Sequence, residues 1–156
     1  MIFCTVKDVD SPLKFRILRN LFSQIKKQVI KNGAKITLPH IVFGGGVNLE
    51  NLHKIFKPIV DTSNNIIKIK EMYLNTRKNN ALFSTVTIEK GTSQEFFIEL
   101  LTADSKTTIR LFPLTDPKKT DSVKYALVHV SRLISELDSS LNITKTNLQD
   151  YLGKNE

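Results

Sequence analysis

Two histidines and a run of glycines are the residues of this chain whose types and spacing could do chemistry. His40 stands in the stretch LPHIVFGGGVN, shortly before the glycines at positions 44–46. His129 stands in VHVS, two residues before Ser131. Imidazoles donate and accept protons near neutral pH. A glycine-rich turn that leads into a helix can hold an anion on its free backbone N–H groups. The sequence therefore offers two candidate chemistries, acid–base catalysis and phosphate binding.

The stretches LPHIVFGGGVNLENL and VHVS resemble the two motifs of the two-histidine (2H, LigT-like) phosphoesterases. In that family each motif is a strand with the pattern His-x-Thr/Ser, and the first is often preceded by proline and followed by glycine and a helix. The resemblance implies that His40 and His129 act as an acid–base pair and that Ser131 holds the phosphate. The first motif lacks its Thr/Ser, because Val42 occupies that position.

This chemistry makes a demand on local structure. A histidine and a hydroxyl two residues apart share a face only if the segment is a strand. The phosphoesterase interpretation, with cyclic phosphates or 2′,5′-linked nucleotides as substrates, therefore requires an extended conformation around His129.

The glycines have a second interpretation. The lysine and hydroxyl residue of a P-loop are missing, and the next glycine is Gly91, so no dinucleotide-binding spacing exists. Glycine also allows a tight reversal or a close approach of two backbones. A weak anion-binding site thus remains one of two alternatives, and its residues would be Gly44, Gly45 and Gly46.

Positive charge is concentrated near the beginning of the chain. The formal charge is +8, and residues 1–35 carry eight basic groups against Asp8 and Asp10. Such a field favours nucleic acids and acidic protein surfaces, although a solvated basic face is the alternative. We expect an acidic partner to contact five residues, Lys14, Arg16, Arg19, Lys26 and Lys27.

Composition excludes several classes of protein. The chain has 156 residues, 40 % hydrophobic and 24 % charged, which is typical of a globular domain. Its single cysteine, Cys4, excludes an intrachain disulfide and suits a reducing compartment. No apolar run is long enough to cross a bilayer, and no cluster of side chains has metal-ligand spacing. We expect an intracellular protein of cytoplasm or nucleus, with no membrane contact, no metal and no cofactor.

Hydrophobic spacing predicts the elements that would position these residues. A proline-started amphipathic helix is expected from Ser11 to Gly33, after a short strand at 2–7. A strand over 35–43 should lead through the glycines into a helix that is capped by Asn48 and ends before Pro58. From 65 to 113 the period changes to two, which predicts four antiparallel strands separated by short turns.

Two segments keep alternatives. Residues 92–101 contain a capping-box pattern typical of a helix, but the short turns on both sides favour a strand. Residues 120–137 repeat apolar side chains at three and four, which favours a long helix, capped by Thr120 or Asp121, over a strand. Phenylalanines and tyrosines fall mainly at core-type positions, so no base-stacking platform is expected.

Together these patterns predict an α+β domain over residues 1–140 and a partly ordered C-terminal tail over 141–156. The domain would hold a basic N-terminal amphipathic helix, an antiparallel β-meander of about four strands with one or two further strands, and a long C-terminal helix packed on the sheet. The function we expect is a non-enzymatic binding or assembly module, a subunit of a larger complex with a protein partner and a possible nucleic-acid partner. The phosphoesterase is the alternative.

Overall fold

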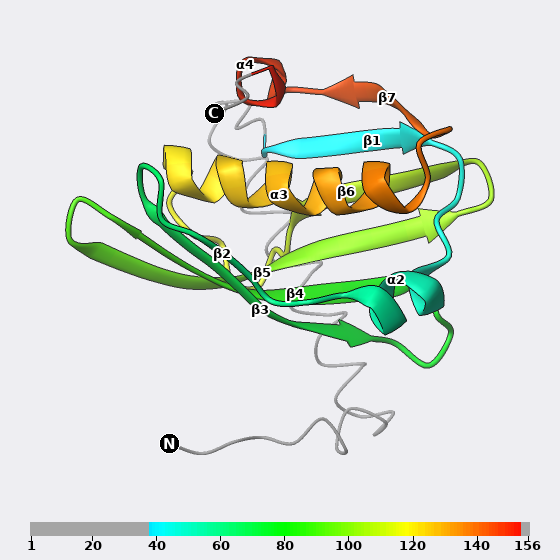
Figure 1. Ribbon diagram of the computed structural model, residues 1–156, viewed down its shortest axis with the longest axis horizontal. Coiled ribbons are helices and arrows are strands. Elements are labelled where there is room, and N and C mark those ends of the chain that lie inside the picture. Colours follow the sequence, from blue (N-terminus) through cyan, green and yellow to red (C-terminus); the bar gives the residue numbers. More distant parts are fainter. Residues whose placement is uncertain (1–37, 154–156) are drawn as a thin grey trace, which may run out of the picture. The chain divides into compact units, whose positions relative to one another are not determined.

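The computed structural model describes residues 38–153, which form seven strands and three helices (Figure 1). The predicted N-terminal strand and basic helix, with Cys4 and the five proposed partner-binding residues, lie outside the described residues. In chain order the elements are β1 (His40–Gly44), α2 (Leu49–Ile55), β2 (Ile59–Asp61), β3 (Ile66–Leu74), β4 (Asn80–Glu89), β5 (Thr92–Ala103), β6 (Lys106–Leu111), α3 (Asp121–Leu137), β7 (Asn142–Thr146) and α4 (Gln149–Leu152).

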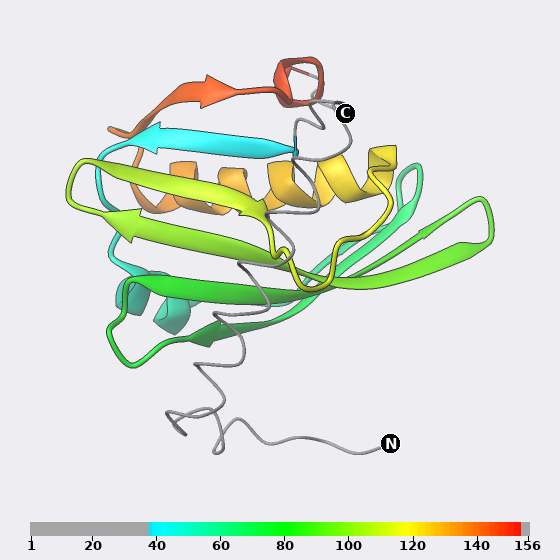
Figure 2. The ribbon, with the colours of Figure 1, turned by 180° about the vertical axis from the view of Figure 1, so that it is seen from behind.

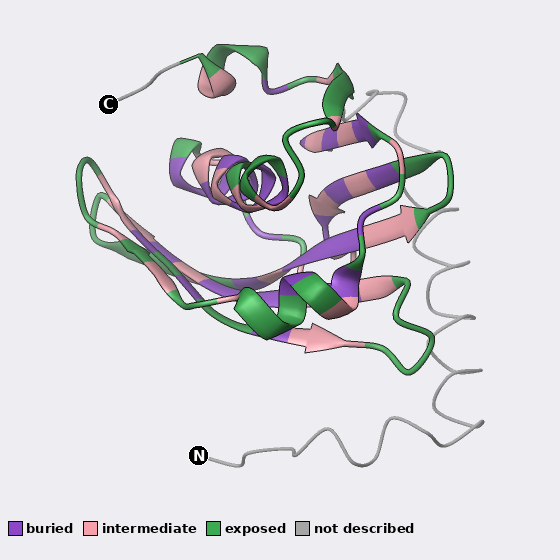
Figure 3. Cartoon of the chain, turned by 45° about the vertical axis from the view of Figure 1, so that its right-hand side comes forward, coloured by how far each residue is buried: buried purple, intermediate pink, exposed green. Residues whose placement is uncertain are grey.

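The strands form one antiparallel sheet in the order β2-β3-β4-β5-β6-β1-β7. Strands β3 to β6 are the four-stranded meander that the period of two predicted, and that prediction is confirmed. The segment 92–101 is extended within β5, as the short turns on both sides favoured. The sheet curls around α3 (Figures 1 and 3), and from behind its strands pass in front of that helix (Figure 2). The mixed α and β class is confirmed for the described residues.

The long helix α3 provides one half of the core. Its 17 residues confirm the helical interpretation of 120–137. The apolar residues spaced by three and four face the sheet and are fully buried; they are Val123, Ala126, Leu127, Val130 and Ile134. Alternate residues of the strands face them from the inner side of the sheet, including Ile41, Phe83, Ile98 and Ile109. Burial of these side chains away from water stabilises both layers together.

The start of α3 is capped by another element. Thr120, one of the two predicted caps, makes no side-chain capping hydrogen bond. A carboxylate oxygen of Glu89, at the end of β4, instead accepts a hydrogen bond of 3.0 Å from the backbone N–H of Ser122. Four N–H groups at a helix start lack partners within the helix. The sheet therefore satisfies one of them, and this hydrogen bond lowers the pKa of the Glu89 carboxyl.

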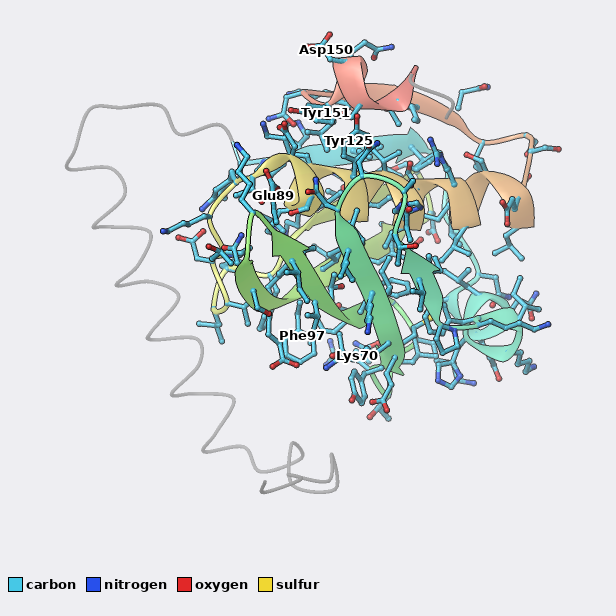
Figure 4. All side chains as sticks on the ribbon, turned by 60° about the vertical axis from the view of Figure 1, so that its left-hand side comes forward. Lys70, Glu89, Phe97, Tyr125, Asp150 and Tyr151 are labelled. Atoms are coloured by element: carbon cyan, nitrogen blue, oxygen red, sulfur yellow. The ribbon has the colours of Figure 1, made fainter. Side chains whose placement is uncertain are left out.

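The outer face of the sheet carries more aromatic side chains than the sequence predicted. Alternation along β5 places Phe96 in the core and Phe97 on the outer face, where Figure 4 shows it on the far side of the sheet from Tyr125. Phe97 makes edge contacts with Tyr73 and Phe112, with ring centroids 6.3 Å and 6.4 Å apart. Phe97 is therefore an exception to the core positions expected for most of the aromatic residues.

The segment after residue 140 contains a strand and a short helix. Strand β7 pairs with β1 at the edge of the sheet, and Leu148 is buried in the core. Tyr151 of α4 lies against Tyr125 of α3, with ring centroids 5.1 Å apart (Figure 4). Residues 142–152 thus extend the same sheet and core, and only residues 154–156 lie outside the described part of this end.

Replacing Leu127 with alanine should destabilise the protein by about 2–5 kcal/mol, because it leaves a cavity between α3 and the sheet. The matched control is Ile55→Ala, since Ile55 is 57 % exposed and should change stability by only about 0.5 kcal/mol. Urea unfolding followed by circular dichroism measures both. Equal losses for the two variants would contradict the assignment of α3 as the centre of the core.

Candidate functional site

The structure does not bring the two histidines together. His40 lies on β1, opposite Arg110 of β6, and both project from the outer face because the intervening Ile41 and Ile109 point inward. Its main-chain N–H donates to the Asn147 side chain, and its ring Nδ1 lies 2.9 Å from the carbonyl oxygen of Leu38. His129 belongs to α3, on the inner side. The sheet therefore separates the two imidazoles.

The VHVS stretch lies inside α3, where residues two apart point in different directions. The Ser131 hydroxyl is buried and donates a hydrogen bond of 2.7 Å to the carbonyl of Val128. The His129 ring instead reaches Asp61 at the end of β2, with Nε2 2.8 Å from a carboxylate oxygen. His129 and Ser131 do not form the strand face that the phosphoesterase resemblance requires.

The glycines allow the chain that follows β1 to pass close to the turn between β5 and β6. A Cβ on Gly46 would stand 2.6 Å from the carbonyl oxygen of Ala103, too close for any side chain. Gly45 has a φ of +113°, which side chains rarely allow. At each of these two positions there is therefore a specific structural reason for glycine.

Two backbone N–H groups after β1, those of Gly45 and Val47, are already occupied. The N–H of Gly45 donates to the carbonyl of Ser105 at 3.0 Å. The N–H of Val47 lies 2.9 Å from the Thr102 hydroxyl oxygen and 3.1 Å from that of Thr107, so two threonines take the place that a phosphate would fill. An open polar groove of about 450 Å³ borders this turn, with Lys78 among its lining residues. Lys78 itself pairs with Glu50 at 2.8 Å.

The Asp61–His129 pair is the polar cluster best placed for chemistry among the described residues. It lines a small pocket between α3 and the β2–β3 loop, with Ser63, Tyr125 and Arg132 also on its wall. The pocket measures about 30 Å³, room for one water-sized group. The ring of His129 is 15 % exposed and is held by the carboxylate. The pair therefore fixes the end of β2 against the helix.

A catalytic triad is not formed here. Both the hydroxyl and the backbone N–H of Ser63 donate to Asp61, so the serine is bound to the carboxylate and not to the imidazole. These bonds from Ser63, followed by the contact with His129, lower the pKa of the Asp61 carboxyl. In a Ser–His–Asp triad the hydroxyl donates to the imidazole, and the carboxylate binds the other side of that imidazole. Here the hydroxyl and the imidazole both contact the carboxylate, so the arrangement stabilises a charged carboxylate and is not a triad.

A buried carboxylate lies on the outer face of the sheet. Glu99 of β5 is 4 % exposed and accepts hydrogen bonds from Arg110 at 2.7 Å and from Asn80 at 3.0 Å. A buried charge must be paired and hydrogen-bonded to be tolerated. Within residues 38–153 no group of three histidine, cysteine or acidic side chains could hold a metal ion.

The sequence missed Asp61, Ser63 and the strand β2 that carries the aspartate. One signal was present: an aspartate two residues before a serine favours a turn in which the carboxylate accepts the serine N–H. No local signal could have identified His129 as the partner, because that contact spans 68 positions of the chain.

Comparisons with known proteins give one partial similarity. No family model and no solved structure matches the chain. A stretch of 92 residues is 27 % identical to a tRNA (guanine-N(7)-)-methyltransferase of Thermotoga maritima. The match covers 58 % of this chain and 28 % of that enzyme, so the chain spans less than a third of the methyltransferase. No helix of residues 38–153 is long and apolar enough to cross a membrane.

Replacing Asp61 with asparagine should lower stability at neutral pH and not in acid. The folded-state pKa of Asp61 is depressed, so its carboxylate stabilises the fold above about pH 4. That contribution is lost as the pH falls through the lower pKa of the folded state. Unfolding midpoints of wild type and variant should differ at pH 7 and converge at low pH. A difference that stayed constant would contradict this role of the charge.

Replacing Gly46 with alanine should destabilise the fold by about 1–3 kcal/mol, because the added methyl group meets the Ala103 carbonyl. Gly153→Ala is the control, since a Cβ there meets nothing within 4 Å. Thermal unfolding of both variants measures the difference. A Gly46 variant as stable as the control would contradict this steric role of the glycine.

Proposed function

We propose that this chain is a non-enzymatic binding or assembly module, a subunit of a larger intracellular complex. Its basic N-terminal segment, residues 11–33, forms an amphipathic helix whose cations contact an acidic partner or nucleic acid. The contacting residues are Lys14, Arg16, Arg19, Lys26 and Lys27.

The distribution of charge is the observation that supports this proposal. In the described part of the chain many cations already have carboxylate partners. These ion pairs are Lys70–Glu95, Lys78–Glu50, Arg110–Glu99, Lys119–Asp116 and Lys124–Asp121. Most of the formal excess of +8 is carried by residues 1–35, where eight basic groups stand against two acidic ones. A cation without a carboxylate partner keeps its full attraction for a polyanion.

The partial similarity supports nucleic acid as one partner. The similar enzyme is named for a tRNA substrate, and the similar stretch is only a part of it. A part of an RNA-modifying enzyme can contribute to binding without carrying the reaction. We therefore propose RNA as the nucleic acid to test first, and no methyl transfer by this chain.

Reversing Lys26 and Lys27 to glutamate should weaken binding of a tRNA-sized RNA about tenfold or more at low salt, because each lost phosphate contact also removes a released counterion. The matched control is Lys118→Glu with Lys119→Glu, a second adjacent lysine pair, which should reduce affinity less. Fluorescence anisotropy at two salt concentrations measures both, and circular dichroism checks the fold. Equal effects of the two double variants would show that only net charge counts.

The phosphoesterase alternative has a separate assay. The wild-type chain should not hydrolyse a 2′,3′-cyclic nucleotide or a short 2′,5′-linked oligoadenylate, because the sheet separates His40 from His129. Product is followed by chromatography. Turnover that disappears in both His40→Ala and His129→Ala would overturn the binding proposal in favour of the enzyme.

A further inference from the structure

Strand β2 leaves one edge of the sheet open within the described part of the chain. It pairs with β3 through the three residues Ile59–Asp61 and has no strand on its other side among residues 38–153. An edge strand presents backbone N–H and C=O groups that can pair with another chain. This edge is therefore a place where an extended peptide could add to the sheet.

An aliphatic side chain is exposed on this edge strand. Val60, in the middle of β2, is 63 % exposed, which is the highest value among the large hydrophobic residues that the structure describes. Single exposed aliphatic residues are ordinary, but this one belongs to the open edge itself. An apolar side chain of a bound peptide would remove it from water.

The same corner is positively charged. From His53 to Val60 the sequence HKIFKPIV contains Lys54 and Lys57 and no carboxylate, although Lys54 pairs with Glu50 at 3.8 Å. Lys68 of β3 is exposed and stands directly opposite Val60 in the strand register. The nearest acid on β2, Asp61, is bound to His129. Charge complementarity therefore favours an acidic occupant.

The edge is held in place before anything binds. The contact of Asp61 with His129 ties the end of β2 to α3. The ring of Phe56, just before the strand, packs against Phe83 of β4 with centroids 5.5 Å apart. A strand that is already ordered loses less conformational entropy when a partner adds to it.

We propose that the open edge of β2 binds an acidic protein segment in an extended conformation. The backbone of the segment pairs with β2, its carboxylates meet Lys57 and Lys68, and an apolar side chain covers Val60. This inference rests on the proposed function, and it assigns the acidic partner to this edge. A protein segment fits better than RNA, because peptide N–H and C=O groups pair with a strand edge and a phosphate backbone has no equivalent row of donors and acceptors.

The test uses the full chain and a labelled decapeptide in which glutamate and valine alternate along one strand face, with threonine at every position between them, because Val60 and Lys68 share a face. Binding is measured by fluorescence anisotropy. Lys57→Glu with Lys68→Glu should lower affinity about tenfold or more, and Val60→Ser should also weaken binding. The matched control, Lys106→Glu with Lys145→Glu on β6 and β7, should have little effect. A version of the peptide with every second backbone nitrogen methylated should bind at least about tenfold more weakly, because it cannot pair along one edge.

Several outcomes would overturn the inference. They are no binding of the decapeptide, equal binding of the methylated peptide, or equal losses in the two lysine double variants. A uridine 20-mer is tested as a competitor. If it displaces the peptide, and if its own affinity falls in the Lys57 and Lys68 variant, the edge is assigned to RNA instead.

The edge and the basic N-terminal segment can fail separately. If peptide binding is insensitive to the edge variants and is lost on reversal of Lys26 and Lys27, the edge assignment fails while the proposed function stands. If peptide binding is lost in the edge variants and RNA binding is insensitive to reversal of Lys26 and Lys27, the edge assignment stands. In that case the proposed role of the N-terminal segment fails.

Discussion

The inner face of the sheet and the apolar side of α3 bury each other, and the other elements are arranged around this contact. The helix supplies Leu127 and Ile134, and the strands supply Phe83 and Ile98, all fully buried. Among residues 38–153 the curved sheet has two edge strands, β2 on one side and β7 on the other. The contact with α3 buries the inner face of the sheet and does not pair the outer backbone groups of β2.

Hydrophobic burial holds α3 against the sheet, and polar contacts fix its position there. Glu89 of β4 accepts the N–H of Ser122 at the start of α3, and Asp61 of β2 binds His129 further along it. Both carboxyl groups have lowered pKa values because they accept hydrogen bonds in the folded state. Hydrophobic burial is non-directional, whereas these hydrogen bonds fix where the helix lies along the sheet. The histidine that resembled a catalytic residue therefore has a structural partner.

The sequence predicted the elements whose pattern is local and long. Four strands with a period of two and one helix with a period of 3.6 were identified, since those periods follow directly from which side of each element faces the core. The short edge strands β2 and β7 were missed, because three to five residues give too little pattern and their pairing depends on distant partners. Phe96 and Phe97 are adjacent, so a strand must place them on opposite faces, but which of the two faces the core depends on the neighbouring elements.

The candidate site was less predictable for the same physical reason. LPHIVFGGGVN and VHVS are short local patterns, while catalysis by two imidazoles is a property of three-dimensional geometry. Here His40 lies on the outer face of strand β1, whereas His129 lies within helix α3. The two stretches that resemble one family's motifs therefore have different secondary structures. The glycines were ambiguous until the Ala103 carbonyl was seen next to Gly46. Neither the separation of the two histidines nor the approach of the Ala103 carbonyl to Gly46 can be predicted from a stretch of a few residues.

The basic residues fall into two groups, those paired with carboxylates and those exposed without one in their own segment. Cations that pair with carboxylates, such as Arg110 with the buried Glu99, hold the fold and are poorly available to a partner. Removing Arg110 would leave the buried carboxylate of Glu99 without its cation and destabilise the protein. Exposed lysines without a carboxylate in their own segment, such as Lys57 beside β2, add little to stability. Substitutions at these lysines should preserve the fold, so the proposed binding can be tested without a loss of stability.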